Sequence, residues 1–569
     1  MVKIYKEIKF LILVLPLLIV GCSSGGSDEK TIVLFKMELS SYFSPNNLVS
    51  TLQESNEYVV VVFEDGQTSS IKSQLVSVNK GYWNIEFSFK DYTTLTVGAI
   101  GSDLQVEFSA EENSLVPLSR QFSADIPYPG LLRMTSLGRF GQGTDISSQK
   151  VSVDSGLYSS FVHGLYESGS TEVRFDYLNA NGELRYSHVM EINSHDYNAN
   201  LDLNLDTDVR VNNTPDELRL FLMRHRSTDH GIFMVDQYGS IRWYLDSPTV
   251  NYGVQQTARG TILWVSNRMI HEFNLEGEEV ERVEIPEEYG RIHHDIVDVG
   301  DRKFLLTVNH PTEPTEEDFV ILYDAAVQSV VKEWDLNESI PKSSLLWADD
   351  IDWFHNNAIE LDVRDNSLLL SGQRSGVAKI SEDNELVWML TDPQRFTNAP
   401  EDIQNKILFN QYSEIITWGQ HDIRLDPDSE DYYLFDNGYG RNYRHTEVFS
   451  RGVRFSVDES DLSYEVIATF GEEYGELHSP IISSIDYKSS ESVLLNFGSI
   501  GYNLEFISNT KRGPVWKDPQ PNYGSAIQEY DFSGNLLLDI RFSGRYSEGP
   551  RAEKDPGLYR VRYATVYLK

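Results

Sequence analysis

A strand–turn–strand unit that recurs six times after about residue 213 restricts the fold of this chain more than any other feature. Each unit has an apolar strand that ends in Asp or Asn, a tight turn and a second strand, often with a Trp. The copies lie at residues 235–243, 273–278, 322–334, 380–388, 457–460 and 530–535. The turns are about 59 residues apart on average, a length that suits one four-stranded unit with its loops. We therefore predict an all-β fold in which residues 213–569 form a six-bladed β-propeller.

The residues before the repeat have the same strand signature without its period. Runs rich in Val, Ile, Tyr and Phe, such as residues 58–63 and 173–177, end at turns of Gly, Asn and Asp. Such alternation of short strands and tight turns is typical of β-hairpins, and helical periodicity is nearly absent. We predict that residues 31–212 form an N-terminal β-sandwich region of one or two units ahead of the propeller.

The amino terminus has the pattern of a bacterial lipoprotein signal. Three lysines precede an apolar run at residues 10–20, which is too short to span a bilayer comfortably. The run ends at Cys22, the only cysteine of the chain, and Ser23 follows it. We predict a signal peptide at residues 1–21, palmitate-type acylation at Cys22 and a polar tether at residues 22–30. The expected location is the bacterial cell envelope, lipid-anchored to the outer membrane and facing the periplasm.

The charge balance excludes some partners. The chain has 48 Lys and Arg against 87 Asp and Glu, for a net charge of −39. Nucleic-acid binding needs a basic surface, so no nucleic-acid partner is expected. A single cysteine also excludes a disulfide framework and a cysteine-based zinc site.

Four histidines stand ahead of apolar strands in four consecutive predicted blades. They are His294, His355, His421 and His478, which lie 61, 66 and 57 residues apart. Equivalent positions in successive blades surround the central channel, so this spacing predicts that the four imidazoles are in register and converge at one mouth. Converging imidazoles can bind a metal, move protons or act as nucleophiles.

Asp295 and Asp422 follow two of these histidines directly. Strand alternation predicts that both carboxylates point away from the channel. Two interpretations remain open at this point. The carboxylates could orient a ring nitrogen through neighbouring groups, or they could be charges at the surface or at a strand edge.

Around these histidines the chain resembles the bacterial aryl-sulfate sulfotransferases, the arylsulfotransferase family that needs no nucleotide sulfate donor. The stretch D-W-F-H-N-N-A at residues 352–358 is similar to the family's D-W-x-H-x-N-S pattern. Further similar segments are residues 293–296 (H-H-D-I), 419–422 (G-Q-H-D), 434–438 (L-F-D-N-G) and 164–166 (G-L-Y). The resemblance extends over about residues 113–569.

The resemblance implies a propeller with a sandwich domain and a ping-pong transfer of a sulfuryl group between phenols. On that basis His421 is the nucleophile, which becomes a sulfohistidine and then passes the group on. His294 and His355 would hold the sulfuryl oxygens and move the phenolic proton, and Asn357 would position one of them. All four are predicted catalytic residues.

The resemblance also implies the ligands. Phenolic sulfate esters are the expected donors and phenols the expected acceptors, without a cofactor or a metal. His293 and His478 are further candidates for substrate binding, and a homodimer is one assembly that the sequence leaves open.

One departure from the family pattern concerns the arginine that binds sulfate oxygens. The family has S-R-x-x-S after the H-x-N strand, and Gly372 stands where that arginine is expected. Arg374 lies two residues on, hence on the same side of a strand, and we predict that it reaches the channel as a catalytic residue. The alternative is a position on the rim.

Two other functions stay open on the sequence alone. One is a metal-dependent propeller enzyme with His294, His355, His421 and His478 as ligands. The other is a non-enzymatic surface lipoprotein whose propeller binds a glycan or a protein. Loss of activity on chelation would indicate the first, and a His421→Ala variant with wild-type behaviour would indicate the second.

Overall fold

The computed structural model describes the chain most fully from residue 106 onward. Of the first 105 residues it describes five strands: β1 (Leu15–Leu17), β2 (Ile32–Glu38), β3 (Tyr58–Glu64), β4 (Tyr82–Phe87) and β5 (Leu95–Ile100). The further described residues are 106–109, 115–126, 128–140, 144–194, 205–214, 217–225, 231–246, 252–310, 312–343, 350–412, 414–439, 449–472, 477–488, 491–500, 504–505, 515–516, 524–544 and 557–567. Cys22 and the predicted tether therefore lie outside the described residues, and no helix within them is long and apolar enough to cross a membrane.

Residues 106–194 form two antiparallel sheets that face each other. One sheet has the strand order β10-β8-β12-β13, with β9 on β8, and the other has the order β11-β7-β6. Their bounds are β6 (Val106–Phe108), β7 (Arg120–Ile126), β8 (Gly130–Ser136), β9 (Ile146–Ser147), β10 (Val151–Val153), β11 (Gly156–Val162), β12 (Gly169–Leu178) and β13 (Leu184–Ser194). Buried and less buried residues alternate along β7, and the rings of Phe122 and Phe175 meet in the core between the sheets, 5.0 Å apart. This is the predicted sandwich arrangement.

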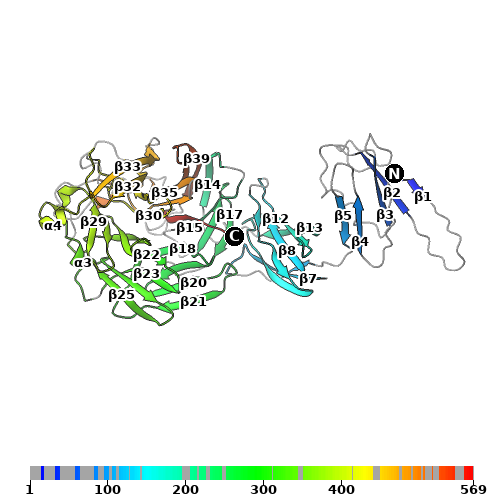
Figure 1. The fold of residues 1–569 in the computed structure, drawn as a ribbon, viewed down its shortest axis with the longest axis horizontal. Coiled ribbons are helices and arrows are strands. Elements are labelled where there is room, and N and C mark those ends of the chain that lie inside the picture. Colours follow the sequence, from blue (N-terminus) through cyan, green and yellow to red (C-terminus); the bar gives the residue numbers. More distant parts are fainter. Residues whose placement is uncertain are drawn as a thin grey trace.

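Six sheets of four or five antiparallel strands follow in the described part of residues 205–563 (Figure 1). The first two have the orders β17-β16-β15-β40 and β18-β19-β20-β21, and the next three are β22–β25, β26–β29 and β30–β33 in sequence order. The last has the order β14-β39-β38-β35-β34. The bounds of the strands in the first three sheets are β15 (Leu220–His225), β16 (Ile232–Asp236), β17 (Ile241–Leu245), β18 (Tyr252–Gln256), β19 (Ile262–Ser266), β20 (Met269–Phe273), β21 (Glu279–Glu284), β22 (Ile292–Asp298), β23 (Lys303–Val308), β24 (Phe319–Asp324) and β25 (Ser329–Asp335).

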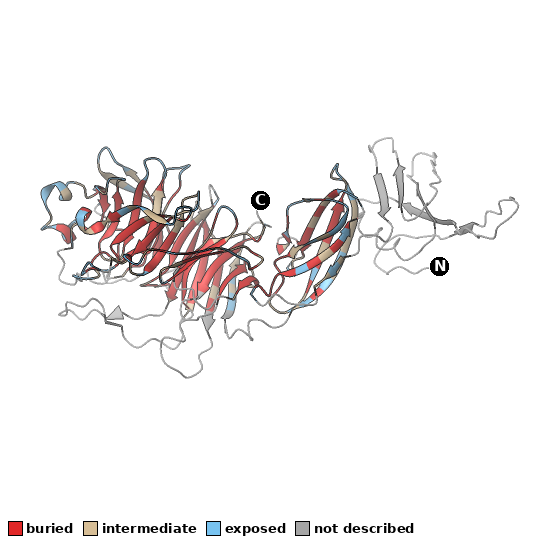
Figure 2. Ribbon diagram, turned by 90° about the horizontal axis from the view of Figure 1, so that it is seen from below, coloured by how far each residue is buried: buried red, intermediate tan, exposed pale blue. Residues whose placement is uncertain are grey.

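The remaining elements complete the ring of sheets. Their bounds are β14 (Leu205–Asn212), α3 (Leu336–Ser339), β26 (Asn356–Asp362), β27 (Ser367–Gly372), β28 (Gly376–Ile380), β29 (Leu386–Leu390), η2 (Pro393–Phe396), α4 (Glu401–Gln404), β30 (Ile423–Leu425), β31 (Tyr432–Asp436), β32 (Arg451–Asp458), β33 (Ser463–Phe470), β34 (Ser484–Lys488), β35 (Ser492–Ile500), β36 (Leu504–Glu505), β37 (Val515–Trp516), β38 (Gly524–Asp531), β39 (Leu536–Gly544) and β40 (Leu558–Tyr563). The innermost strands contact one another in the cyclic order β40, β18, β22, β26, β30, β34 and back to β40. The all-β propeller prediction is therefore confirmed, and buried residues follow the strands of every sheet (Figure 2).

All six predicted hairpins are present: five are the outer strand pairs of their sheets, and the sixth, β38-β39, is covered on its outer side by β14. In the first of them the turn between β16 and β17 is closed by Asp236, whose Oδ1 accepts hydrogen bonds from the amides of Tyr238 (2.9 Å) and Ser240 (3.1 Å). An Asp that ends a strand can bond the amides two residues on, which is why this residue type recurs at these turns.

Strands from both ends of the propeller region close the ring. β40, close to the carboxyl terminus, pairs with β15 as the innermost strand of the first sheet. β14, which precedes the predicted boundary at residue 213, pairs with β39 at the outer edge of the last sheet. The boundary itself stays a prediction.

A buried arginine joins the sandwich to the first sheet of the propeller. Arg242 is fully buried, donates to the carbonyl of Gly164 through Nε (3.0 Å) and Nη2 (2.9 Å), and pairs with Asp236 at 3.0 Å. Its guanidinium lies over the Tyr166 ring, 4.0 Å from the centroid. The G-L-Y turn seen in the sequence is thus one of the contacts between the two domains, beside that of His163 with Glu276.

Candidate active site

The inner strands of four successive sheets begin at the same mouth of the ring, and strand pairing fixes which of their residues are equivalent. Ile296, Ile359, Ile423 and Ile485 each pair with a leucine of the neighbouring strand. The residues two positions earlier are therefore equivalent as well. These are His294, Asn357, His421 and Ser483, which lie 63, 64 and 62 residues apart.

The prediction that four histidines are in register is correct for His294 and His421 and wrong for the other two. His355 lies two residues before the equivalent position, which Asn357 occupies. His478 is half-buried in the segment between β33 and β34, five residues before Ser483. The spacing of the histidines does not reveal these shifts. Loops of unequal length precede the strands, so a histidine can lie a few residues ahead of its strand while the overall spacing stays close to one blade.

The structure nevertheless brings four imidazoles together, with His294 at the centre. Its ring centroid lies 4.9 Å from that of His355, 5.3 Å from that of His293 and 6.3 Å from that of His421. His355 reaches the group despite its different register because it stands in a left-handed conformation (φ 56°) just ahead of β26. Of the four histidines predicted to converge, His294, His355 and His421 therefore do so, and His293 joins them.

His421 is held as a neutral imidazole with a defined tautomer. Its Nδ1 lies 2.9 Å from the carbonyl oxygen of Ser483, which can only accept, so Nδ1 carries the proton. Burial, followed by the charges of Arg560 and His294, lowers the pKa of His421 well below its ordinary value. The lone pair is consequently on Nε2, which has no hydrogen bond to any described residue.

Neighbouring backbone groups fix the position of His421. Its amide donates to the carbonyl of Phe435 at 3.0 Å. The preceding residue, Gln420, donates through Nε2 to the carbonyl of Gly372 (2.9 Å) and accepts at its own carbonyl from Nδ2 of Asn357 (3.0 Å). Asn357 therefore positions the chain immediately before His421, and its predicted role beside His294 or His355 stays a prediction.

His355 is held as an imidazolium between two carboxylates. Its Nδ1 lies 2.9 Å from Glu317 Oε2 and 3.0 Å from the carboxylate of Asp352. Burial acts to lower the pKa of His355, but the negative charges of Glu317 and Asp352 outweigh it and raise that pKa to about 10. The ring is 22% exposed, so it faces the mouth rather than the closed interior.

Glu317 joins His355 to His294. The Nε2 of His294 donates to Glu317 Oε2 at 3.1 Å, and its Nδ1 lies 2.5 Å from the hydroxyl oxygen of Tyr559. Burial would raise the pKa of Glu317, but His294 and His355 outweigh it and hold that pKa far below the ordinary range. The carboxylate is thus a fixed negative charge shared by two imidazoles.

Sequence reasoning missed Glu317, Tyr559 and Arg560. Glu317 stands in an acidic run that looks like exposed surface, yet it is 6% exposed with a left-handed backbone (φ 60°). Tyr559 and Arg560 lie on β40, more than 130 residues from His421 in sequence, and reach the site only because that strand closes the ring. No local pattern in the sequence marks them.

Asp295 and Asp422 are buried, so the surface interpretation of both is wrong. Asp295 binds the guanidinium of Arg560, and Asp422 binds that of Arg562 at 2.7 and 2.9 Å. Each also accepts a backbone amide from the next sheet, that of Ile359 at 3.0 Å for Asp295 and that of Ile485 at 3.1 Å for Asp422. The two carboxylates therefore bind β40 to the inner strands.

Arg374 lies in the turn after β27 rather than on the strand, because β27 ends at Gly372. Its Nη2 donates to Asp352 Oδ2 at 2.8 Å, and the side chain is 30% exposed. It therefore joins the carboxylate that also holds His355, at the exposed edge of the site. At Gly372 an added Cβ would lie 2.6 Å from the ring of Phe354, so this chain has no room for a side chain there.

Comparison with known proteins points to one family. The model of the family described as "Arylsulfotransferase (ASST)" matches residues 206–548. Two curated relatives, both named "Arylsulfate sulfotransferase AssT", come from Escherichia coli O6:H1 and Lelliottia amnigena. They are each 25% identical, over 346 and 345 residues, in alignments that cover 47% of this chain and 57% of the relative. The match thus spans little more than half the length of these relatives.

Solved structures are similar only at a low level. A protein of unknown function from Bacteroides caccae has a TM-score of 0.36 at 10% identity and covers 61% of this chain and 99% of its own. The Dos1 propeller has a TM-score of 0.25 at 9% identity and covers 58% of this chain and 96% of its own.

Proposed function

The chain belongs to the arylsulfotransferase family, and from that premise we propose that it transfers a sulfuryl group from an aryl sulfate ester to a phenol. The observation that carries the proposal is the state of His421. It is buried, neutral and protonated on Nδ1, with its Nε2 lone pair at the meeting point of the imidazoles. An imidazole prepared in this way is a nucleophile that needs no separate base.

In the first half-reaction His421 Nε2 attacks the sulfur of the ester. A nitrogen–sulfur bond forms, the bond between sulfur and the aryl oxygen breaks, and its electron pair leaves with the phenolate. The product on the enzyme is a sulfohistidine. The proton stays on Nδ1, which continues to donate its hydrogen bond to the Ser483 carbonyl. This hydrogen bond stabilises the positive charge that spreads over the ring when Nε2 is substituted.

His355 is the proposed proton donor to the departing phenolate. Its pKa of about 10 is close to that of a phenol, so the proton can pass in either direction with little loss of free energy. In the second half-reaction the acceptor phenol returns its proton to His355, its oxygen attacks sulfur, and the nitrogen–sulfur bond breaks. Donor and acceptor thus exchange one sulfuryl group, and the enzyme returns to its starting state.

The positive charge that the sulfuryl oxygens need comes, on this proposal, from two arginines. Arg560 is buried beside His421, where its charge lowers the pKa of that histidine. Arg374 lies at the exposed edge and is tied to Asp352. Together they replace the arginine for which Gly372 leaves no room, and His294 completes the pocket with Tyr559.

The test uses p-nitrophenyl sulfate with and without added phenol. We expect phenol-dependent release of p-nitrophenol, reduced on the order of 10³-fold or more in His421→Ala. His188→Ala, a histidine of the sandwich strand β13, is the matched control and should retain activity. With donor alone, mass spectrometry of peptides should find sulfate on His421. Release that survives His421→Ala unchanged would refute the mechanism, and no release from several aryl sulfates would refute the function.

We also propose that Cys22 carries the lipid that places the protein at the outer membrane, facing the periplasm. The support is the position of this single cysteine directly after a basic and apolar segment. A Cys22→Ala variant should move from the membrane fraction to the soluble fraction. If it stays in the membrane fraction, another anchor is responsible.

A further inference from the structure

The mouth of the propeller contains an imidazole that the transfer mechanism does not use. His293 is completely buried, and neither of its ring nitrogens has a hydrogen-bond partner among the described residues. The backbone of Val308 is near enough to influence the ring but lies outside hydrogen-bond geometry. A buried polar group left in this state costs free energy unless a ligand pairs with it.

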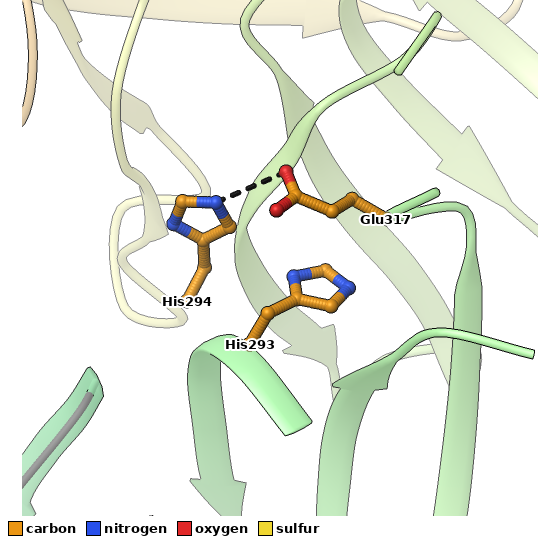
Figure 3. A group of neighbouring side chains, drawn as sticks. All are labelled: His293, His294 and Glu317. Atoms are coloured by element: carbon orange, nitrogen blue, oxygen red, sulfur yellow. Dashed lines mark hydrogen bonds and ion pairs between the residues drawn. The ribbon is translucent and has the colours of Figure 1, made fainter. Parts of the chain in front are cut away.

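Two further donor groups lie beside His293. One nitrogen of His293, one of His294 and one carboxylate oxygen of Glu317 all lie within 4.8 Å of one another. Figure 3 shows the Glu317 carboxylate close to both rings, with its hydrogen bond to His294 dashed. Two imidazoles and one carboxylate are a donor set that suits first-row divalent transition metals.

We propose that His293, His294 and Glu317 form a binding site for one divalent transition-metal ion of the zinc class. The ion would pair with the orphaned nitrogen of His293 and with the carboxylate of Glu317. His294 would bind through Nε2, giving up the proton that it now donates to Glu317 and taking one on Nδ1. The hydroxyl oxygen of Tyr559, 2.5 Å from Nδ1, would then accept that proton's hydrogen bond and hold the ring in place.

Glu317 also belongs to a second group of possible ligands, with Asp352 and His355. That group is the poorer site for two reasons. Asp352 is already paired with Arg374 at 2.8 Å, and Nδ1 of His355 is already held between the carboxylates of Glu317 (2.9 Å) and Asp352 (3.0 Å). His293, by contrast, is completely buried, and neither of its ring nitrogens has a hydrogen-bond partner among the described residues.

This inference does not depend on the transferase proposal, and its test measures binding alone. The full chain, purified without a polyhistidine tag and stripped with a chelator, is titrated with Co²⁺ while the visible spectrum of the bound ion is recorded. Zn²⁺ is then added to displace it, and metal per chain is counted by elemental analysis. We expect one ion per chain, bound tightly enough to survive gel filtration.

The variants are His293→Asn and Glu317→Gln, which remove a ligand with little change in shape. Each should weaken Co²⁺ binding by at least about 10- to 100-fold. His310→Asn is the control, since this half-buried histidine lies outside the three ligands and bonds Thr312 at 2.8 Å. Circular dichroism confirms that each variant is folded, and Glu317→Gln decides the matter if His293→Asn does not fold. Unchanged binding in folded variants, or no binding to the wild-type chain, would overturn the proposal.

Discussion

At the scale of single residues, the site is built on strained backbone. His294, His355, Asp422 and Ser483 all have left-handed φ angles, between 47° and 92°. For residues other than glycine this conformation costs about 1–3 kcal/mol each, and it recurs here near the start of the inner strands β22, β26, β30 and β34. The hydrogen bonds of Ser483 and Asp422 to neighbouring sheets hold the strained turns in place, so catalytic geometry and ring assembly depend on the same contacts.

The charge of Asp352 should set the pH range of the transfer reaction. On the proposed mechanism His355 donates the proton, so kcat should fall as pH rises through its pKa of about 10. Asp352→Asn removes one of the charges that raise this pKa, and the fall should therefore begin at lower pH. The pH profile of kcat for both proteins measures the shift. Asp350→Asn, a change at an exposed residue nearby, should leave the profile in place; an unshifted profile in Asp352→Asn would contradict the role of His355.

The same pair should stabilise the fold over a defined pH range. Because the folded pKa of His355 is raised above its ordinary value of 6.5, its stabilising effect is fully present below about pH 6.5 and is lost as pH rises through about 10. The difference in unfolding midpoint between wild type and Asp352→Asn should therefore shrink between these pH values. Thermal denaturation across this range tests it, and a difference that grows with pH would contradict the assignment.

At the scale of elements, β27 and β40 shape the site in opposite ways. β27 restricts it, because Gly372 at its end packs against the Phe354 ring and leaves Arg374 to the turn beyond. β40 contributes side chains to the site, because this one strand brings Tyr559, Arg560 and Arg562 to the inner edge of the ring. The buried arginines Arg560 and Arg562 are thus brought to the site by the strand that closes the ring.

Gly372→Ala should be destabilising although the residue has no left-handed backbone. The new Cβ would lie 2.6 Å from Phe354, and relieving such a clash costs about 1–3 kcal/mol. The control is a double-mutant cycle with Phe354→Leu, in which the cost of Gly372→Ala should become smaller. Equal cost in both backgrounds, measured by urea denaturation, would mean that the ring is not what excludes the side chain.

The buried ion pairs of β40 should contribute to the stability of the closed propeller. Arg562→Met leaves Asp422, which is 1% exposed, without its partner, and removing one member of a buried pair costs about 3–5 kcal/mol. Arg268→Met, which breaks the exposed pair with Glu284, should cost far less. The free energies of unfolding of the two variants make the comparison. Similar small losses in both would show that β40 is held by its strand pairing alone.

At the scale of the whole molecule, the propeller places positively charged arginines at its site although the protein as a whole is acidic. The chain carries a net charge of −39, so its surface would repel the anionic aryl sulfate of the proposed reaction, while Arg374 and Arg560 would attract it locally. We propose that the acidic residues keep the surface hydrated and the protein soluble, and that they slow the association of the anionic donor.

Salt should therefore assist the enzyme at low ionic strength. Screening weakens the repulsion between the acidic surface and the anionic donor, so kcat/KM for p-nitrophenyl sulfate should rise with added NaCl. Rates measured from about 10 to 300 mM salt span the range over which the screening length falls below about 10 Å. A neutral acceptor phenol at saturating donor is the control, since its kcat/KM should change little. Salt-independent rates with the donor would exclude a role for surface charge in access.

Local interactions explain what the sequence could predict. The hairpins follow from strand patterns and from Asp side chains that bond amides two residues on, and both are visible within ten residues. His421, His355 and Asn357 stand out because short motifs around them resemble the family pattern. Each of these features depends on neighbours in the chain.

What the sequence determined by itself is the all-β class, the six hairpins and three residues of the site. Only the tertiary structure decided the register of the inner strands and the partners Glu317, Tyr559 and Arg560. The number of residues between two histidines includes both loop and strand residues, so this spacing does not give the register. Only the pairing of the strands fixes it. These partners come from two separate segments, one of which is β40, and they meet at the site only when β40 closes the ring, because contacts between distant residues are made by burial and pairing in the folded state.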